Sequence, residues 1–272
     1  MKRNFYLSKV MITAVMFLGL LGCGSKKQES AEDKKEINIA VTEISEVSLK
    51  AAENENQKKG FKEKLILVDS NVALLKSIND GSVDAGMAVH KPFMEKFNRE
   101  NNGDLVMVQP YTYYTGIGLY SEKHKSLDEM PQKARISIMN DAMNMDKGLR
   151  MLEDAGLITL DKSKSGQYTL LDIKENPKNI EIIEMDQAQT VKSLEELDGA
   201  VVFFTHMRNA GKDYTSYLFR DQDAKDYPIA LVVKKGNENA PWALALAESL
   251  RSEEAAKVIK EHFGGVFTTY ED

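Results

Sequence analysis

The sequence lacks most of the residue patterns on which enzymes, metalloproteins and nucleic-acid-binding proteins depend. Its 272 residues include one cysteine, Cys23, so the chain can form no internal disulfide and its folded part has no cysteine nucleophile. The four histidines show no paired metal-ligand spacing, and neither a phosphate loop nor a serine elbow is present. The net charge of −6, with both signs mixed, argues against nucleic-acid binding. We therefore expect no catalytic residue, no cofactor, no metal and no nucleic-acid partner.

Long apolar runs are also missing, apart from a short one near the amino end. Residues 10–21 carry no charge and follow Lys2, Arg3 and Lys9. A membrane-spanning helix needs about 20 apolar residues, so this stretch is short for a span. A basic region followed by a short apolar region and small residues is typical of a secretory signal peptide, which we assign to residues 1–22.

The cysteine stands directly at the predicted cleavage point. The tetrapeptide Leu20-Leu21-Gly22-Cys23 resembles the bacterial lipobox, which implies that Cys23 becomes the lipid-modified first residue of the mature protein. An ordinary signal peptide with an incidental thiol is the alternative. Behind it the chain is charged and nearly free of apolar side chains, so residues 23–36 are predicted to be a lipidated cysteine and a flexible tether. We expect a lipid-anchored protein on the extracytoplasmic side of the cell membrane.

From residue 37 onward, short apolar runs alternate with amphipathic segments. Runs at 37–41 and 65–68 flank a charged segment, which is the spacing of a βαβ unit and predicts a parallel sheet. A helix should follow until Gly81, and the small residues of the next strand, at 83–89, indicate close backbone approach. Two further strands are expected at 105–110 and 116–121.

The pattern restarts near residue 134. We expect strands at 134–139, 168–173, 180–185 and 199–204, and helices from about Met145 to Gly156 and at 191–197. Segments 75–90 and 191–206 each suggest a helix, a turn and an apolar strand that ends at a histidine, His90 or His206. Two halves of similar plan are typical of a protein with two α/β lobes.

The carboxyl-terminal part suggests that the chain returns to the first lobe. A late strand lies at 226–236, and residues 240–265 contain two amphipathic helices. We predict a first lobe of residues 37–120 plus 228–272, a second lobe of residues 121–227, and two crossings that form a hinge near Tyr120 and Tyr227.

Several phrases along the chain resemble one known family. The stretches "HKPFMEKFN", "GLYSEKHKSLDEMP", "LEDAGLI" and "DIKENPKNIEIIEMDQAQ" are similar, in this order, to the methionine-binding lipoproteins of ABC importers, the NlpA/MetQ-type family. The resemblance implies a type II periplasmic-binding-protein fold, with a ligand in the interlobe cleft and hinge closure on binding. It also implies an ABC permease and ATPase as partners. A fold alone does not decide the ligand.

The same resemblance implies a set of ligand-binding positions, some of which carry changed residues. His90, Asn140 and Asn144 keep the family's side chains, whereas Ala88 and Asn71 stand where the family has aromatic rings. Phe93 replaces a tyrosine, Phe203 replaces a head-group asparagine, and Lys147 replaces the arginine that grips a carboxylate. Because lysine cannot reproduce a two-pronged contact and each unpaired buried polar group costs about 1–3 kcal/mol, these changes argue against free methionine.

The charge of Lys147 and the positions of two histidines and two tyrosines need separate interpretation. Lys147 opposes the helix dipole, which makes sense if an anionic group binds nearby, or else it points to solvent with Asp146 offsetting its charge. His90 is expected in the cleft, whereas His206 is equally compatible with cleft and core. In "TYYTG", Tyr113 or Tyr114 should lie near the cleft mouth, and we placed Tyr114 in the site.

The sequence thus predicts a lipid-anchored solute-binding protein of an ABC importer. Its ligand should be a small molecule, an amino acid or a related anion, and the protein should be a monomer. An enzyme is one rival, which turnover of a small substrate would reveal. A surface lipoprotein that acts as an adhesin or antigen, with a lost or changed transport role, is the other.

Overall fold

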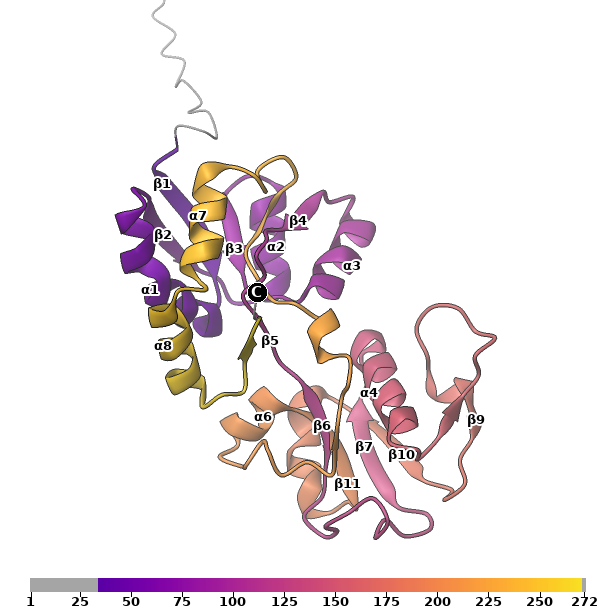
Figure 1. Ribbon diagram of the computed structural model, residues 1–272. Helices are drawn as coiled ribbons and strands as arrows, with labels where there is room; N and C mark the ends of the chain where they lie inside the picture. Colours follow the sequence, from indigo (N-terminus) through magenta and orange to yellow (C-terminus); the bar gives the residue numbers. More distant parts are fainter. Residues whose placement is uncertain (1–33, 271–272) are drawn as a thin grey trace, which may run out of the picture.

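The protein is described here from a computed structural model that covers residues 34–270 (Figure 1). The predicted signal peptide, Cys23 and most of the predicted tether lie outside these described residues. Two separate five-stranded sheets, with orders β2-β1-β3-β13-β4 and β10-β7-β11-β6-β12, form the centres of two lobes. Helices cover both sheets, and chain segments cross between the lobes near the middle of the molecule (Figure 1). The α/β architecture with two lobes is therefore as predicted.

The first sheet is parallel except for one strand. It consists of β1 (Glu36–Val41), β2 (Lys62–Leu67), β3 (Ala85–Met87), β4 (Leu105–Met107) and β13 (Val232–Lys234). Strand β1 pairs in parallel with β2 and β3, whereas β13 runs antiparallel to β3 and β4. Because β13 comes from the far end of the chain, this sheet is completed only after the chain has returned from the second lobe.

Three helices connect the early strands, namely α1 (Glu43–Lys58), α2 (Asn71–Asn79) and α3 (Lys91–Asn101). The expected close approach of strand β3 is present at Gly86, where an added Cβ would lie 2.7 Å from the Leu74 Cδ2 atom. Helix α2 therefore packs directly on the backbone of β3, which confirms the interpretation of the small residues.

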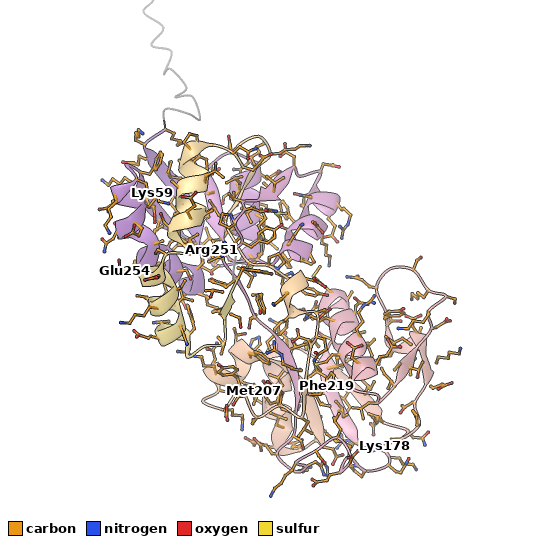
Figure 2. All side chains as sticks on the ribbon, in the orientation of Figure 1. Lys59, Lys178, Met207, Phe219, Arg251 and Glu254 are labelled. Carbon is orange, nitrogen blue, oxygen red and sulfur yellow. The ribbon has the colours of Figure 1, made fainter. Side chains whose placement is uncertain are left out.

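The carboxyl-terminal helices α7 (Pro241–Ser249) and α8 (Glu253–Phe263) pack beside α1 in the first lobe (Figure 1). Trp242 of α7 is almost completely buried there. Lys59, directly after α1, forms an ion pair of 2.5 Å with Glu248 of α7. Figure 2 shows Lys59, Arg251 and Glu254 together on this side of the first lobe. The chain thus returns to the first lobe after the second sheet.

The second sheet contains β6 (Ile117–Tyr120), β7 (Arg135–Met139), β10 (Glu181–Met185), β11 (Gly199–Phe203) and β12 (Phe219–Arg220). Strands β10 and β11 pair in parallel with β7, and β6 runs antiparallel to β11. Our first lobe extended to residue 120, but β6 belongs to the second sheet, so that boundary is wrong. The first crossing precedes β6, around the short strand β5 (Tyr113–Tyr114), which pairs with β14 (Thr268–Thr269).

Local elements of the second lobe differ in part from the predictions. Helix α4 (Ala142–Asp154) begins earlier than Met145, because the Asp141 carboxylate accepts the Asn144 N–H at 3.1 Å and caps the helix. The strand expected at 168–173 is mainly the short 3-10 helix η1 (Leu170–Asp172), followed by β9 (Ile173–Glu175), which pairs with β8 (Thr159–Leu160). Asp172 accepts hydrogen bonds from the Thr169 backbone and hydroxyl, so turn chemistry overrides the apolar run.

The remaining connections of the second lobe are short helices. The helix expected at 191–197 is only the short 3-10 helix η2 (Lys192–Glu195), which follows α5 (Gln187–Thr190). Helix α6 (Phe204–Asn209) follows β11, and η3 (Ala224–Asp226) precedes the return crossing. His206 therefore lies within α6, one turn beyond the strand at whose end we placed it. His90 lies directly before α3, close to its expected position.

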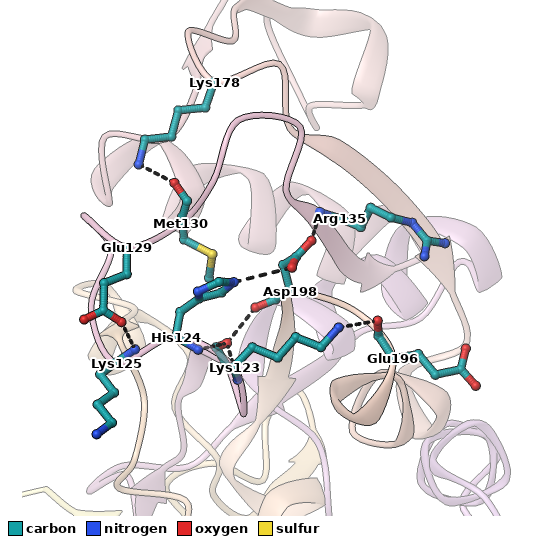
Figure 3. Close-up of polar contacts among 10 residues, drawn as sticks. Lys123, His124, Lys125, Glu129, Met130, Arg135, Lys178, Glu196 and Asp198 are labelled. Atoms are coloured by element: carbon teal, nitrogen blue, oxygen red, sulfur yellow. Dashed lines mark hydrogen bonds and ion pairs between the residues drawn. The ribbon is translucent and has the colours of Figure 1, made fainter.

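The amino ends of the second sheet are tied together by hydrogen bonds (Figure 3). The Asp198 carboxylate accepts the Arg135 N–H at 2.8 Å and lies 3.4 Å from the His124 Nε2 atom, and its backbone oxygen accepts the Ser121 hydroxyl at 2.6 Å. The Lys178 ammonium donates to the Met130 carbonyl at 2.8 Å. Since Arg135 begins β7, this network lies at the opposite end of the strands from Asn140 and His206. His124 is thus a structural residue.

Candidate functional site

A cleft with a volume of about 910 Å³ lies between the two lobes. Its walls come from the carboxyl ends of strands in both sheets, the edge at which α/β proteins receive small ligands. The lining residues are Thr42, Glu43, Ile44, Leu67, Val68, Asp69, Ser70, Asn71, Ala88, His90, Phe93, Tyr113, Thr115, Asn144, Gln187, Phe203, Thr205, His206, Ile229 and Phe267. Six of the nine ligand-binding residues that we predicted are on this wall: Asn71, Ala88, His90, Phe93, Asn144 and Phe203.

The first lobe supplies the starts of three helices to this wall. Helix α1 follows β1 directly, and α2 begins at Asn71, where the Ser70 hydroxyl accepts the Ala73 N–H at 3.1 Å. Ile44 and Leu67 keep 44% and 61% of their surface exposed, although both are large apolar residues. Exposed apolar side chains at a cleft mark a surface that is prepared to meet a ligand.

His90 is held as a neutral ring at the amino end of α3. Its Nδ1 atom accepts the Phe93 N–H at 3.2 Å, so the ring proton is on Nε2. Burial, and then the charge of Lys147, lower the pKa of His90 to about 4. The ring packs edge-on against Tyr227 with centroids 5.6 Å apart. His90 therefore offers one neutral N–H donor and carries no charge near neutral pH.

The second lobe supplies Asn144, Gln187, Phe203, Thr205 and His206. The Asn144 amide group donates to the Asp141 carboxylate at 2.8 Å and to the Gln187 side-chain oxygen at 3.3 Å. His206 is in the cleft, although the sequence left it open, and burial lowers its pKa. Phe203 packs against it with ring centroids 6.1 Å apart. Asn144 thus directs its amide N–H groups to partners within the protein.

Lys147 is buried, so the interpretation that it points to solvent is wrong. Its side chain is 3% exposed, and its ammonium lies 2.7 Å from the Asp221 carboxylate and 2.9 Å from that of Asp223. It also lies 3.7 Å from the centroid of the Tyr227 ring. Asp146 instead pairs with Arg150. Two aspartates of the return crossing therefore already pair with Lys147.

The Asp221 carboxylate depends on this contact. It is 2% exposed, and burial raises its pKa while Lys147 opposes that shift. A second, much smaller cavity is lined by Lys147 and Tyr227 together with His90, Thr115, Phe203 and Ile229, which also line the main cleft. The lysine is consequently a structural tie between α4 and the return crossing.

The remaining two predicted residues are elsewhere. Asn140 is exposed after β7, and its backbone N–H donates to the Met185 carbonyl at 2.9 Å. Tyr114 is buried against Tyr270, with ring centroids 5.1 Å apart, whereas its neighbour Tyr113 lines the cleft and shares a 3.1 Å hydrogen bond with Ser48. Successive residues of a strand point to opposite faces, so choosing Tyr114 placed the wrong ring in the cleft.

Sequence reasoning missed several cleft residues, notably Glu43, Asp69, Gln187, Thr205 and Phe267. Gln187 lies in the "DQAQ" phrase that carries the family resemblance, so the phrase was informative but its role was not assigned. Glu43 and Asp69 follow the ends of β1 and β2, which makes them identifiable from the βαβ pattern. Within residues 34–270, no group of three or more His, Cys, Asp or Glu side chains could hold a metal ion.

With this geometry established, comparison with known proteins decides the family. The family model described as NlpA lipoprotein matches residues 37–269, which is nearly all of the described chain. The chain belongs to the NlpA lipoprotein family. The resemblance seen in the sequence is therefore confirmed.

The sequences of individual relatives match this NlpA lipoprotein over most of their length. It is 31% identical over 261 residues to the methionine-binding lipoprotein MetQ of Bacillus subtilis, covering 92% of this chain and 94% of that protein. It is 30% identical to the probable D-methionine-binding lipoprotein MetQ of Vibrio cholerae, with 93% of each chain covered.

Solved structures give the same result for the fold. A YaeC-family lipoprotein from Enterococcus faecalis matches with a TM-score of 0.81 at 31% identity, over 88% of this chain and all of that one. A nutrient-binding protein from Burkholderia cenocepacia bound to methionine matches with a TM-score of 0.73 at 28% identity, over 86% of this chain and all of that one. The fold is that of periplasmic substrate-binding proteins, and this NlpA lipoprotein is a solute-binding protein of the ABC-importer type.

Proposed function

We propose that this protein captures a small solute in its interlobe cleft and delivers it to an ABC permease that is driven by an ATPase. The observation that carries the proposal is the cleft of about 910 Å³, to which both lobes and the two crossings contribute side chains. Closing the lobes would cover a small ligand from both sides, which is the hinge mechanism of two-lobed binding proteins. The relatives' names identify methionine as the solute that they bind, so methionine is the reference ligand for every test.

The proposed site consists of the six predicted residues on the cleft wall together with Gln187, Thr205 and His206. Substitutions on this wall should change ligand affinity while leaving the folded state intact. Phe203→Ala is the sharpest single test, because the ring packs on His206 in the cleft and is only half-buried without ligand. Isothermal titration calorimetry should show at least a tenfold loss of affinity for the captured solute, whereas Leu171→Ala, an exposed position outside the cleft wall, should leave affinity unchanged.

Binding, rather than catalysis, is the activity we propose for the cleft. Members of this family are substrate-binding proteins, and the cleft wall offers two histidines that burial keeps neutral but no paired nucleophile and base. A captured solute should therefore be released unchanged. Mass spectrometry of the solute before and after incubation would test this, and a chemical change that depends on folded protein would contradict it.

We further propose that Cys23 carries a lipid that holds the protein at the extracytoplasmic face of the cell membrane. The relatives are lipoproteins, and within residues 34–270 no helix is long and apolar enough to cross a membrane. Radiolabelled palmitate should be incorporated into the wild-type protein and lost in Cys23→Ala. Labelling that survives this substitution would remove Cys23 as the anchor. We also expect a monomer in solution, which light scattering of the mature chain would test.

A further inference from the structure

The charged side chains that line the cleft are acidic. Glu43 and Asp69 are on its wall, both exposed, and no lysine or arginine is among the lining residues within the described chain. Neither acid has an ion-pair partner in residues 34–270, so their charges act on whatever enters the cleft. These two carboxylates repel a ligand carboxylate and attract a ligand cation.

Lys147 cannot compensate for these acids. An ammonium has three protons to donate, and here two carboxylates and the Tyr227 ring face surround it at 2.7, 2.9 and 3.7 Å. A ligand carboxylate would have to displace an aspartate from this cluster to reach the lysine. Because Asp221 is 2% exposed, displacing it would cost its 2.7 Å contact with Lys147 and leave only Arg220, at 3.8 Å, as a nearby cation.

The Asn144 side chain offers a ligand a hydrogen-bond acceptor. The Asp141 carboxylate can only accept hydrogen bonds, so the 2.8 Å contact identifies the Asn144 nitrogen as the donor to Asp141. The second proton of the same nitrogen is directed to Gln187 at 3.3 Å. The Asn144 oxygen is left to accept a hydrogen bond, as an ammonium or amide N–H would require.

The body of the cleft is apolar. Ile44, Leu67, Phe93, Phe203 and Phe267 line it, and Ala88 leaves room where the resemblance implies an aromatic ring. His90 adds a single neutral donor, because its Nδ1 atom is already occupied by the Phe93 N–H. The wall therefore combines apolar surface, neutral groups and acceptors.

We propose that the solute is a small amine with an apolar body and no free carboxylate, held by the acids and acceptors of the cleft. This inference rests on the proposed function, since it names the class of solute that the same cleft takes. It predicts that methionine, the solute named for the relatives, is not the preferred ligand of this chain.

The deciding experiment identifies the solute that stays bound when the full chain is purified from its own host. Native mass spectrometry gives the mass of the bound molecule, and fragmentation gives its functional groups. An amine without a carboxylate supports both proposals. A carboxylate-bearing solute overturns this inference but leaves solute binding intact. A protein that carries no solute and binds none of the probes below overturns the proposed function, and this inference with it.

Three matched probes measure the preference directly by calorimetry. Methionine carries both head groups, methioninol keeps the ammonium and lacks the carboxylate, and the hydroxy analogue of methionine keeps the carboxylate and lacks the ammonium. We expect methioninol to bind at least tenfold more tightly than the hydroxy analogue. Equal affinities, tighter binding of the hydroxy analogue, or tightest binding of methionine would overturn the proposal. If none of the three probes binds but the natural solute does, the presence or absence of a carboxylate on that solute decides whether the proposal is correct.

Discussion

The two lobes differ in how they partner their charged side chains. In the second lobe, Lys147 is enclosed by Asp221 and Asp223, so charge near the cleft is neutralised inside the protein. In the first lobe, Glu43 and Asp69 face the cleft, and the carboxylate oxygens of the half-buried Glu63 are shielded from solvent beside Asn56. Two lobes of similar plan can therefore place their charges differently. In the second lobe the cation is paired inside the protein, whereas in the first lobe acidic side chains face the ligand cleft.

The largest expected effect on stability comes from breaking the ion pairs of Lys147 with Asp221 and Asp223 in the second lobe. Lys147→Met removes the cation and leaves the buried Asp221 with only Arg220, at 3.8 Å, as a nearby positive charge, which should lower the free energy of unfolding by about 3–5 kcal/mol. Urea denaturation followed by circular dichroism measures the loss.

A second variant separates charge from packing at this position. Combining Lys147→Met with Asp221→Asn removes the orphaned charge together with its partner, so part of the stability should return. A loss below about 1 kcal/mol for the single variant would show that the ion pair is not the stabilising contact.

The next largest effect on stability concerns the shielded carboxylate of Glu63 in the first lobe. Burial, reinforced by the charge of Glu53, raises the pKa of Glu63 from 4.5 to about 7. Between these values the folded state holds a proton that the unfolded state releases, so the contribution of Glu63 to the free energy of unfolding falls as the pH rises. Glu63→Gln should remove this dependence and stabilise the protein by about 1–3 kcal/mol at pH 8.

A matched control for Glu63 is available in the other lobe. Glu63 is in the edge strand β2, and Glu181 is in the edge strand β10, where its side chain is 65% exposed. Urea titrations of both Glu→Gln variants at pH 5 and pH 8 should show a pH-dependent gain for Glu63 alone. Equal behaviour of the two variants would contradict the assignment of a buried charge to β2.

The contrast between the lobes also predicts a smaller effect on binding. Glu43→Gln and Asp69→Asn should each weaken methioninol binding by about two- to fivefold, since exposed charges contribute roughly 0.5–1 kcal/mol. The effect should shrink at high salt because both acids are exposed to solvent. Glu46→Gln, on the same helix but paired with Lys50, is the control and should leave affinity unchanged. Unchanged affinity in both test variants would remove the first-lobe acids from recognition.

Much of the fold could be predicted because it depends on local periodicity. The βαβ spacing from residue 37 and the apolar run at 134–139 correspond to β1, β2 and β7, because the apolar faces that form the core are periodic in sequence. The run at 168–173 was misassigned, since the side chain of Asp172 favours a turn. The boundary at residue 120 failed because a strand's pattern does not say which sheet it joins.

The site was predictable only as far as the family phrases extend. His90 and Phe203 were assigned to the cleft from the family resemblance, but the partner of Lys147 could not be found. Asp223 is 76 residues further along the chain, and nothing in the local sequence connects the two. Sequence reasoning compared Lys147 with its neighbour Asp146, whereas folding brought it to the return crossing.

The smallest effect sharpens the comparison within a single helix. Arg150 of α4 pairs with Asp146 at 3.1 Å, but its side chain is 41% exposed, whereas that of Lys147 is 3% exposed. An exposed pair exchanges protein contacts for water at little net gain, so Arg150→Met should cost less than about 1 kcal/mol, including its contact with the Tyr168 ring. Measured by the same urea titration, its loss should be several times smaller than that of Lys147→Met. Equal losses of unfolding free energy in the two variants would mean that burial does not distinguish the two cations. The ion pairs of Lys147 would then contribute no more to stability than an exposed ion pair.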